Sequence, residues 1–466
     1  MKNARLVSLF TLIVAVLLAS RLVVHAQTPA VAAAKDPGAR AGSVNAGHPL
    51  QSLTASQLQY FQDGQARFVE VDAVANGLGP TYNSDSCSSC HAQPSVGGSS
   101  PSVADYPNIG PNPEVAAANV GGATNRIPSF ITADGPVREV RFPFAVATNG
   151  AVTRTADGGV HDLYTITGRS DANGCSMAQP NFAAMLQANN AIFRIPTPIF
   201  GAGLMESIPD AAIMNNMRAN AAVKAALGIT GHPNTSGNDG SITRFGWKAQ
   251  NKSLEVFAGE AYNVEMGVTN ELFPNERGNA AGACSSNPTS EDVTNFDESG
   301  DRIPSDVVSF AVFMRFLAPP TPSSTGIAGN PTAQSIANGK ALFSQIHCDA
   351  CHTAMLQTGT SKVAALSNKT AALYSDLLVH NMGSGLADNV TQGGAGPDEF
   401  RTAPLWGLGQ RIFFLHDGRS GPANGGLIHA IAQHASSGSE ANRVIALYNN
   451  LSSQQKQDLL NFLRSL

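Results

Sequence analysis

The chain has 466 residues, a formal net charge of −5 and a charged fraction of 14%, with 45 glycines and 27 prolines. This charge gives no sign of nucleic-acid binding. The glycine and proline content is typical of a loop-rich exported protein rather than of a helical bundle, and the length suggests two or three domains.

The first residues have the pattern of a signal peptide. Lys2 and Arg5 form a basic start, Leu6 to Ser20 is an apolar run, and Val24-His25-Ala26 offers a cleavage site with small residues. We therefore predict a signal peptide over residues 1–26 and export to the periplasm. The alternative is an uncleaved N-terminal anchor.

Residues 27–50 follow this signal and are rich in alanine, glycine and proline. They show no hydrophobic periodicity. We interpret them as a flexible tether.

Two predicted helices share the pattern Gly-x-x-x-Phe, at Gly64 to Phe68 and at Gly339 to Phe343. Thr54 can begin the first helix with a capping box. A glycine on a helix face allows another helix to cross closely, and the phenylalanine one turn later packs beside it. For the second helix we expect the crossing partner to be the C-terminal helix, which Ser452 can cap.

Each of these helices precedes the same short motif, Cys87-Ser-Ser-Cys90-His91 and Cys348-Asp-Ala-Cys351-His352. In Cys-x-x-Cys-His the two thiols attach a haem and the histidine binds its iron. Two complete copies predict two covalently bound c-type haems, with His91 and His352 as iron ligands. The alternative is a zinc site built from the cysteine pairs.

The remaining cysteines are Cys175 and Cys284. In an oxidising compartment a matched leftover pair predicts a disulfide, although two free thiols remain the alternative.

Several ordered blocks of sequence resemble the di-haem oxidoreductase family, a distant relative of the bacterial di-haem cytochrome c peroxidases. These blocks are Gly77-Leu-Gly-Pro80, Gly201 to Asp210, Arg244 to Gln250, Val264 to Thr269, Tyr374 to Leu378, Glu399 to Gly407 and Leu415 to Arg419. The resemblance covers nearly all of the chain after the tether. The stretch from about Pro107 to Gly240 has no counterpart that we can place in the smaller relatives.

The resemblance implies a mainly α protein with two cytochrome-c-like haem domains and a long irregular insertion. We expect an N-terminal haem domain with the insertion over residues 51–325 and a C-terminal haem domain over residues 326–466. The C-terminal haem would receive electrons from a small cytochrome or copper protein, and the N-terminal haem would meet hydrogen peroxide. The alternatives are a haem oxygenase acting on an apolar substrate and an electron-transfer cytochrome without chemistry of its own.

The relatives also imply a second axial ligand for the C-terminal haem, on a helix after the His-Asp-Gly block. Leu427 to His434 matches that helix, which makes His434 the expected ligand. His380, Met382 and His416 are the alternatives.

For the N-terminal haem, the relatives carry an acid/base glutamate in a Leu-x-Glu stretch. Glu255 is the expected counterpart, with Gln250 as a polar neighbour, and Glu206 and Glu265 compete for the role. No convincing sixth ligand for this haem is found; His161 and Met266 remain open.

Two further expectations come from the family blocks. Phe400 to Pro404 resembles a segment whose backbone oxygens help to bind calcium between the haem domains. Trp247 and Trp406 also lie in such blocks, and either could lie on an electron route, although buried packing is the commoner use of tryptophan.

Overall fold

The computed structural model describes residues 33–42, 44–101, 112–278, 284, 295–296, 302–303 and 305–466. The chain divides into Met1–Ala34 and Lys35–Leu466, and every element below lies in the second unit. The predicted signal peptide, residues 1–26, lies outside the described residues. In the part of the chain that is described, no helix is long and apolar enough to cross a membrane.

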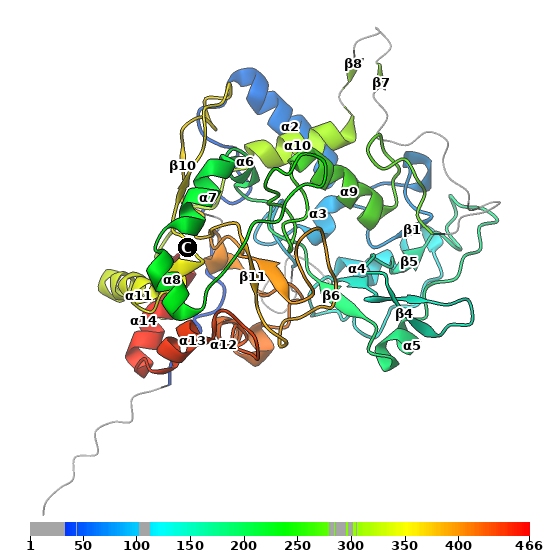
Figure 1. Cartoon of the computed structure of the whole chain (residues 1–466). Coiled ribbons are helices and arrows are strands. Elements are labelled where there is room, and N and C mark those ends of the chain that lie inside the picture. The colour runs from blue at the N-terminus through cyan, green and yellow to red at the C-terminus, as the bar shows by residue number, and fades with distance from the viewer. Residues whose placement is uncertain are drawn as a thin grey trace, which may run out of the picture. The chain divides into compact units, whose positions relative to one another are not determined.

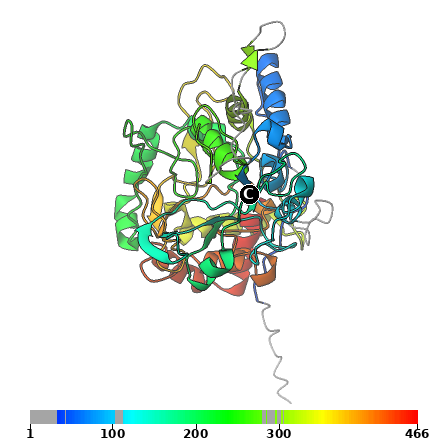
Figure 2. The ribbon, with the colours of Figure 1, turned by 90° about the vertical axis from the view of Figure 1, so that its right-hand side faces the viewer.

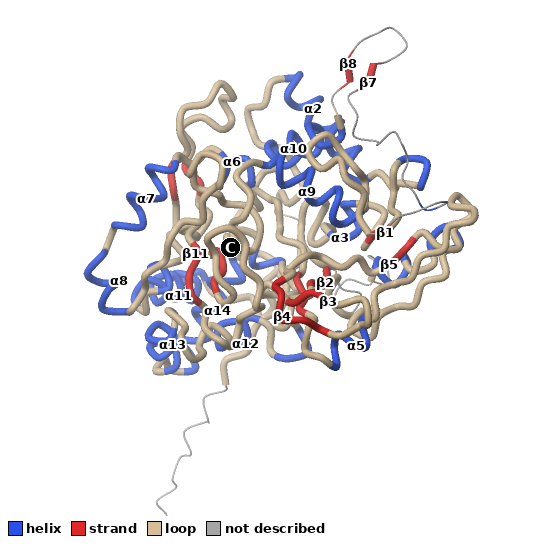
Figure 3. The backbone as a smooth tube through the Cα atoms, turned by 45° about the vertical axis from the view of Figure 1, so that its right-hand side comes forward, coloured by secondary structure: helices blue, strands red, loops and turns tan. Residues whose placement is uncertain are grey.

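The described chain is mainly α, with short strands and many loops (Figures 1 and 3). The α-helices are α2 (Ala55–Val69), α3 (Cys87–Cys90), α4 (Pro113–Ala117), α5 (Phe182–Gln187), α6 (Ala202–Glu206), α7 (Asp210–Arg218), α8 (Ala221–Leu227), α9 (Leu254–Met266), α10 (Asp306–Phe316), α11 (Ala333–Gln345), α12 (Leu427–Ala432), α13 (Asn442–Asn449) and α14 (Ser453–Ser465). Figure 2 shows α2, in blue, and the C-terminal helices, in red, in separate regions of the unit.

The strands form antiparallel pairs rather than a larger sheet. The pairs are β1 (Thr81–Tyr82) with β5 (Tyr164–Thr165), β2 (Glu139–Arg141) with β6 (Ile192–Arg194), β3 (Phe144–Val146) with β4 (Val152–Ala156), β7 (Asn295–Phe296) with β8 (Arg302–Ile303), β9 (Leu356–Gln357) with β10 (Thr370–Ala371), and β11 (Val379–Asn381) with β12 (Glu399–Arg401). The predicted boundary at residue 326 remains a prediction, since both of its sides belong to one compact unit.

The first glycine crossing joins α2 to α10. A Cβ atom at Gly64 would collide with the Ser309 carbonyl, so only glycine allows this approach. The Phe68 ring, one turn later, lies 4.9 Å from the Phe313 ring and 6.0 Å from the His91 imidazole. The capping box predicted at Thr54 is present. This crossing therefore packs the first helix against the histidine of the first haem motif.

The second crossing joins α11 to α14, as the sequence predicts. A Cβ atom at Gly339 would collide with the Asp458 carbonyl of α14. The Phe343 ring lies 5.6 Å from Phe462 and 6.3 Å from the His352 imidazole. Ser452 forms the predicted capping box of α14. The two haem motifs thus share one local architecture.

The prediction of a flexible tether over residues 27–50 is wrong for the residues of this segment that the structure describes. Asp36 forms an ion pair with Arg464 of α14, at 2.7 Å. Arg40 is 1% exposed, and its backbone N–H donates to the Gly409 carbonyl. The composition is that of a loose segment, but these contacts fix it against the C-terminal helix. Residues 27–32 of the tether lie outside the described residues.

Cys175 and Cys284 form the predicted disulfide, which links positions 109 residues apart. On the chain-entropy model, closing so long a loop stabilises the fold by about 4–5 kcal/mol. The bond ties the middle of the chain to the region that precedes α10.

The crossing at Gly339 predicts a local sensitivity to side-chain size. We expect Gly339→Ala to lower the free energy of unfolding by about 1–3 kcal/mol, because a backbone carbonyl occupies the space that the methyl group needs. Gly237→Ala is the matched control, since a Cβ there meets nothing within 4 Å. Denaturant unfolding of both variants checks this. Equal stability of the two variants would contradict the tight crossing.

Candidate functional site

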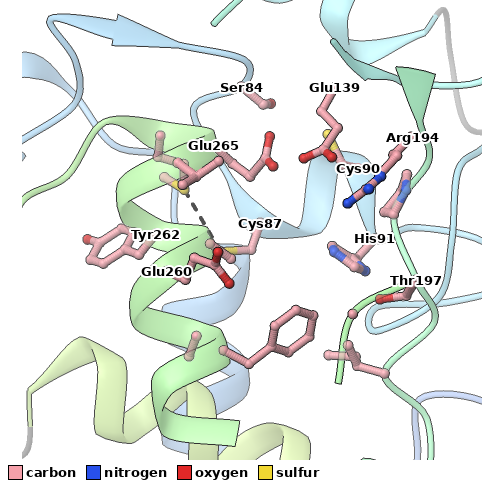
Figure 4. A pocket seen from close by; sticks show the side chains of 18 of the residues that line it. Ser84, Cys87, Cys90, His91, Glu139, Arg194, Thr197, Glu260, Tyr262 and Glu265 are labelled. Carbon is pink, nitrogen blue, oxygen red and sulfur yellow. Dashed lines mark hydrogen bonds between the residues drawn. The ribbon is translucent and has the colours of Figure 1, made fainter. Parts of the chain in front are cut away.

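The first haem motif lines a cavity with about 1180 Å³ of empty space, space open to solvent included. Cys87 and Cys90, both on α3, line it together with His91 (Figure 4). Helix α9, the β2–β6 pair and the segment from Pro196 to Ile199 supply other walls. The cavity is therefore built by segments far apart in the sequence.

The imidazole of His91 is oriented by its own hydrogen bond. Nδ1 lies 2.9 Å from the Gly98 carbonyl, which can only accept, so Nδ1 carries the proton. Burial lowers the pKa of His91 to about 4, so the ring is neutral at pH 7. Its Nε2 lone pair is left free to bind a metal ion.

The second motif lines a separate cavity of about 1440 Å³. His352 repeats the geometry of His91: its Nδ1 lies 3.0 Å from the Tyr374 carbonyl, and burial lowers its pKa to about 4. Cys348 and Cys351 lie beside it. Because the two cysteine pairs line different cavities, they do not assemble one four-thiolate zinc site.

Both cavities also suit the carboxylates of a haem. Arg138 lines the first cavity and its Nε is buried without a hydrogen-bond partner. Arg411 lines the second cavity, and its Nε and Nη2 atoms are also buried without hydrogen-bond partners. Burial lowers the pKa of Arg411 to about 10, so the guanidinium keeps its charge at pH 7. A buried guanidinium with an unpartnered N–H group favours an anionic group in the cavity. With two thiols and a free imidazole nitrogen each, the two cavities fit covalently attached haems.

The four candidates for the second axial position all line the second cavity. His434 is oriented like the two motif histidines, since its Nδ1 lies 2.8 Å from the Ala430 carbonyl. His380 differs, because Asp376 takes its Nε2 at 3.0 Å and Glu440 takes its Nδ1 at 2.8 Å. With both ring nitrogens paired to carboxylates, His380 has no lone pair to offer.

His416 and Met382 are placed less favourably for this role. The His416 ring stacks on Phe400 at 4.3 Å, and Met382 packs beside Phe400's cluster of apolar side chains. Both side chains line the cavity, but among the described residues neither has a hydrogen bond to a backbone carbonyl like the one that orients the His434 ring.

Glu255 is not in the first cavity, which corrects the expectation for the acid/base group. It is exposed in the first turn of α9 and is not among the lining residues. The polar face of α9 that meets the cavity lies further along, at Glu260 and Glu265. The Leu-x-Glu match therefore falls on the wrong face of the helix. Glu206 is also outside, held by Arg315 at 2.6 Å.

Gln250 and Glu265 do line the first cavity. The Gln250 Oε1 atom is buried without a hydrogen-bond partner. Oε2 of Glu265 accepts a hydrogen bond from Asn83 Nδ2 at 2.7 Å. Burial and the neighbouring charge of Glu139 raise the pKa of Glu265 well above its usual value.

Glu139, Arg141 and Arg194 are cavity residues that the sequence did not single out. Glu139 and Arg141 are two apart on β2 and so share one face, and Glu139 lies opposite Arg194 in the β2–β6 register. The only sequence signal is Glu139-Val140-Arg141, a buried valine between two charges. Charge alternation in a loop-rich stretch gives no reason to expect a cavity wall.

The two open candidates for a sixth ligand of the first haem differ in position, because only one of them lines the first cavity. Met266 lines the cavity, with its Sδ 3.8 Å from Cys87 Sγ. His161 is outside, stacked on Phe142 at 3.8 Å and paired with Asp157 at 3.0 Å.

Trp247 is the tryptophan that connects the two sites, because its side chain lines both cavities. Its indole Nε1–H donates to the Ile195 carbonyl at 2.8 Å, which fixes the ring. Trp406 lies in the main hydrophobic core and lines neither cavity. The position of Trp247 is therefore the one compatible with an electron route.

The segment Phe400 to Pro404 does not fit calcium. The Thr402 carbonyl accepts hydrogen bonds from Ser375 Oγ at 2.6 Å and from the Arg401 guanidinium at 3.2 Å. The neighbouring Glu399 carbonyl accepts one from Lys248 Nζ at 2.9 Å. Two buried side-chain cations already use these oxygens, and they would repel a divalent ion.

Comparisons with known proteins agree with this picture at the family level. No curated protein matches the chain. Among solved structures, hydrazine synthase of Kuenenia stuttgartiensis is 14% identical at a TM-score of 0.24, with 45% of this chain and 60% of that chain covered. A MauG-like protein associated with microbial copper homeostasis is 20% identical at 0.23, with 34% and 52% covered. At such scores neither likeness bears on this chain's function.

A family model, by contrast, matches residues 149–466 and is described as "Di-haem oxidoreductase, putative peroxidase". The match covers more than half of the chain, including the second haem motif, Trp247, Glu265 and His434. This protein belongs to the di-haem oxidoreductase family.

Proposed function

We propose that this protein is an exported di-haem c-type oxidoreductase that reduces hydrogen peroxide. The observation that carries the proposal is the pair of separate cavities, each with two motif cysteines and a histidine whose Nε2 is free. The first cavity also contains Glu265, whose pKa is raised well above its usual value. Peroxide chemistry needs a proton donor, so the two cavities have different roles.

A haem held by Cys87, Cys90 and His91 would bind peroxide and pass electrons to it. Reduction of peroxide to two waters consumes two electrons and two protons, and the O–O bond breaks more easily when the departing oxygen receives a proton. Glu265 lines the cavity and, with its raised pKa, is the proposed donor of that proton, while Asn83 fixes its Oε2. Gln250, with its unpartnered Oε1, offers an acceptor for a hydrogen atom of the substrate.

The first cavity combines apolar walls with charged side chains. The charged side chains are Glu114, Arg138, Glu139, Arg141, Arg194, Glu260 and Glu265. The raised pKa of Glu265 in this cavity supports peroxide chemistry, because a purely electron-transferring cytochrome does not need a proton donor there. A haem oxygenase acting on an apolar substrate is the alternative.

The second cavity is the proposed entry point for electrons. His352 and His434 would ligate its iron, and a small cytochrome or copper protein would be the donor. Trp247, which lines both cavities, is the proposed bridge for electron transfer between them.

Covalent attachment of two haems is the first outcome we expect. Mass spectrometry of the exported protein under denaturing conditions should show two haem additions, because each thioether is a covalent bond. Replacing Cys87 and Cys90 together by alanine should remove one haem and leave the other. Bound zinc without covalent haem would contradict the whole proposal.

His434→Ala should convert the second haem from low spin to high spin, because a strong axial imidazole is lost. His434→Met should raise the potential of that haem, since thioether ligation favours ferrous iron. His429→Ala is the matched control: His429 lies on α12, which ends just before the turn that carries His434, and it is outside the cavity with Nδ1 2.8 Å from Ser420 Oγ. Absorption spectra and redox titrations distinguish the variants. Unchanged spectra in both His434 variants would point to His416 or Met382.

Glu265→Gln should slow peroxide turnover by about 10²–10⁴-fold, because it keeps the side-chain shape and removes the transferable proton. Both haems should remain attached. Glu255→Gln is the matched control on the same helix; it should keep full activity, because Glu255 is exposed and outside the cavity. Steady-state kinetics with hydrogen peroxide and a reduced donor measure both. Full activity of Glu265→Gln would exclude this residue as the proton carrier.

A further inference from the structure

Tyr262 is a buried tyrosine of the first cavity whose phenol is paired with a carboxylate. It projects from α9, the helix that also carries Glu260 and Glu265 (Figure 4). Its side chain lines the cavity that contains the first haem motif. Its hydroxyl group donates to Oδ2 of Asp72 at 3.2 Å, and both residues are buried. The phenol proton therefore already points at a group that can take it up.

This pairing decides what the phenol can do chemically. A phenol that loses an electron becomes a strong acid, because loss of the O–H proton relieves the positive charge left on the ring. In a buried site an unrelieved charge is strongly unfavourable. A carboxylate within hydrogen-bond distance removes this obstacle, since the electron and the proton can leave together. Asp72 therefore makes Tyr262 easier to oxidise than a buried phenol that donates only to a carbonyl.

Two other buried tyrosines show the contrast. The hydroxyl group of Tyr82 donates to the Ala117 carbonyl at 3.1 Å, and that of Tyr164 donates to the Glu114 backbone carbonyl at 2.6 Å. A carbonyl oxygen accepts a hydrogen bond but cannot keep the proton. Neither ring lines the first cavity.

Trp247, the tryptophan of the same cavity, is placed less well to lose an electron. Its Nε1–H donates to the Ile195 carbonyl, which cannot keep a proton. The Arg401 guanidinium donates to the carbonyl of Gly246, the residue before Trp247, at 3.1 Å. A positive charge on the indole would be repelled by this cation. Trp247 can mediate electron transfer between the cavities, but Tyr262 is better suited to being oxidised itself.

A path of packed rings joins Tyr262 to the first haem motif. The ring centroids of Tyr262 and Phe310 are 5.0 Å apart. Phe310 lies 6.2 Å from Phe68 in the same measure, and Phe68 lies 6.0 Å from the imidazole of His91. The rings form a continuous chain of contacts from the phenol to the imidazole that would bind the iron.

We propose that Tyr262, with Asp72 as its proton acceptor, is a redox-active tyrosine that supplies one electron to the first site when the donor protein does not. This inference rests on the proposed function, because hydrogen peroxide is the oxidant. In the step, the O–H bond of Tyr262 breaks, the proton bonds to Oδ2 of Asp72, and the electron passes to the site that peroxide has oxidised. Tyr262 becomes a neutral phenoxyl radical and Asp72 a neutral carboxyl group.

The step is reversed when the donor protein returns. Reduction of hydrogen peroxide to two waters takes two electrons and two protons, and Tyr262 supplies one of these electrons. A later electron from the donor, together with the return of the proton from Asp72, regenerates the phenol and the carboxylate. Tyr262 therefore holds one oxidising equivalent at a defined side chain until an electron arrives.

Rapid-freeze electron paramagnetic resonance of the haem-loaded protein tests the proposal. Hydrogen peroxide added without a donor should produce a tyrosine-type radical signal, which should narrow when ring-deuterated tyrosine is incorporated. Tyr262→Phe should lose the signal, because it removes only the hydroxyl group. Tyr82→Phe is the matched control at another buried tyrosine and should keep the signal. A signal of unchanged size in Tyr262→Phe would overturn the inference.

The part played by Asp72 has two tests of its own. Asp72→Asn keeps the size of the side chain but cannot take up the proton, so the radical signal should be lost while both haems stay attached. In heavy water the radical of the wild-type protein should form more slowly, because a deuteron has to move with the electron. This second measurement needs no variant. A radical that forms equally fast in ordinary and heavy water would exclude Asp72 as the proton acceptor.

A peracid separates this inference from the proposed function. If the wild-type protein consumes no hydrogen peroxide, the proposed function fails. The same experiments are then carried out with meta-chloroperoxybenzoic acid as the oxidant. A radical that depends on Tyr262 would support the redox-active tyrosine, whereas the absence of a radical with both oxidants would contradict it.

Discussion

The close helix crossing at Gly64 and Gly339 is the constraint on which both candidate sites depend. At each position a backbone carbonyl of the crossing helix fills the space that any side chain would need. The crossing places a phenylalanine against the proximal histidine one motif later. The histidine is then turned by a backbone carbonyl, so that Nε2 faces the cavity. A larger residue at the crossing would displace the helix and, through the phenylalanine, the imidazole.

The middle of the chain links these two local units rather than standing apart from them. Arg194 reaches from the first cavity to Asp388, and Asp388 also binds Lys248 at 3.1 Å. Near the second cavity, the backbone N–H groups of Thr230 and Gly231 donate to Glu440, which also holds His380. Trp247 lies in the wall between the cavities. Because the pairs of Asp388 with Arg194 and Lys248 are buried, removing one partner would leave a charge unpaired, at a cost of about 3–5 kcal/mol for such a pair.

The two cavities differ in charge chemistry more than in size. The first contains several carboxyls and arginines, and burial raises the pKa of Glu114 and of Glu265 there. The second has His380 held between two carboxylates and a further imidazole, His434. A site that must deliver protons needs groups of differing acidity close together. A site that only passes electrons benefits from fixed ligands. The side chains of the two cavities differ in the way that the proposed division of roles requires.

The sequence by itself determined the features of this protein that depend on residues close together in the chain. Cys87 to His91 and Cys348 to His352 predict the haem attachment points because the chemistry needs those residues at that spacing. Gly-x-x-x-Phe predicted both crossings because the helical period puts the two residues on one face. The free cysteine pair predicted the disulfide for a similar reason, since only two thiols remained.

Tertiary structure decided which acidic group faces the first cavity. Glu255 and Glu265 lie on one helix, and a match to Leu-x-Glu cannot tell which of its faces meets the cavity, because that depends on how α9 packs. Glu139 and Arg141 come from a short strand more than a hundred residues earlier, and their partner Arg194 depends on strand pairing. Asp36 and Arg40 were predicted to belong to a tether because the composition of a segment does not show which distant residue it contacts. In the fold both residues contact Arg464. Each of these outcomes rests on contacts between distant segments, which burial and charge pairing select only once the chain has folded.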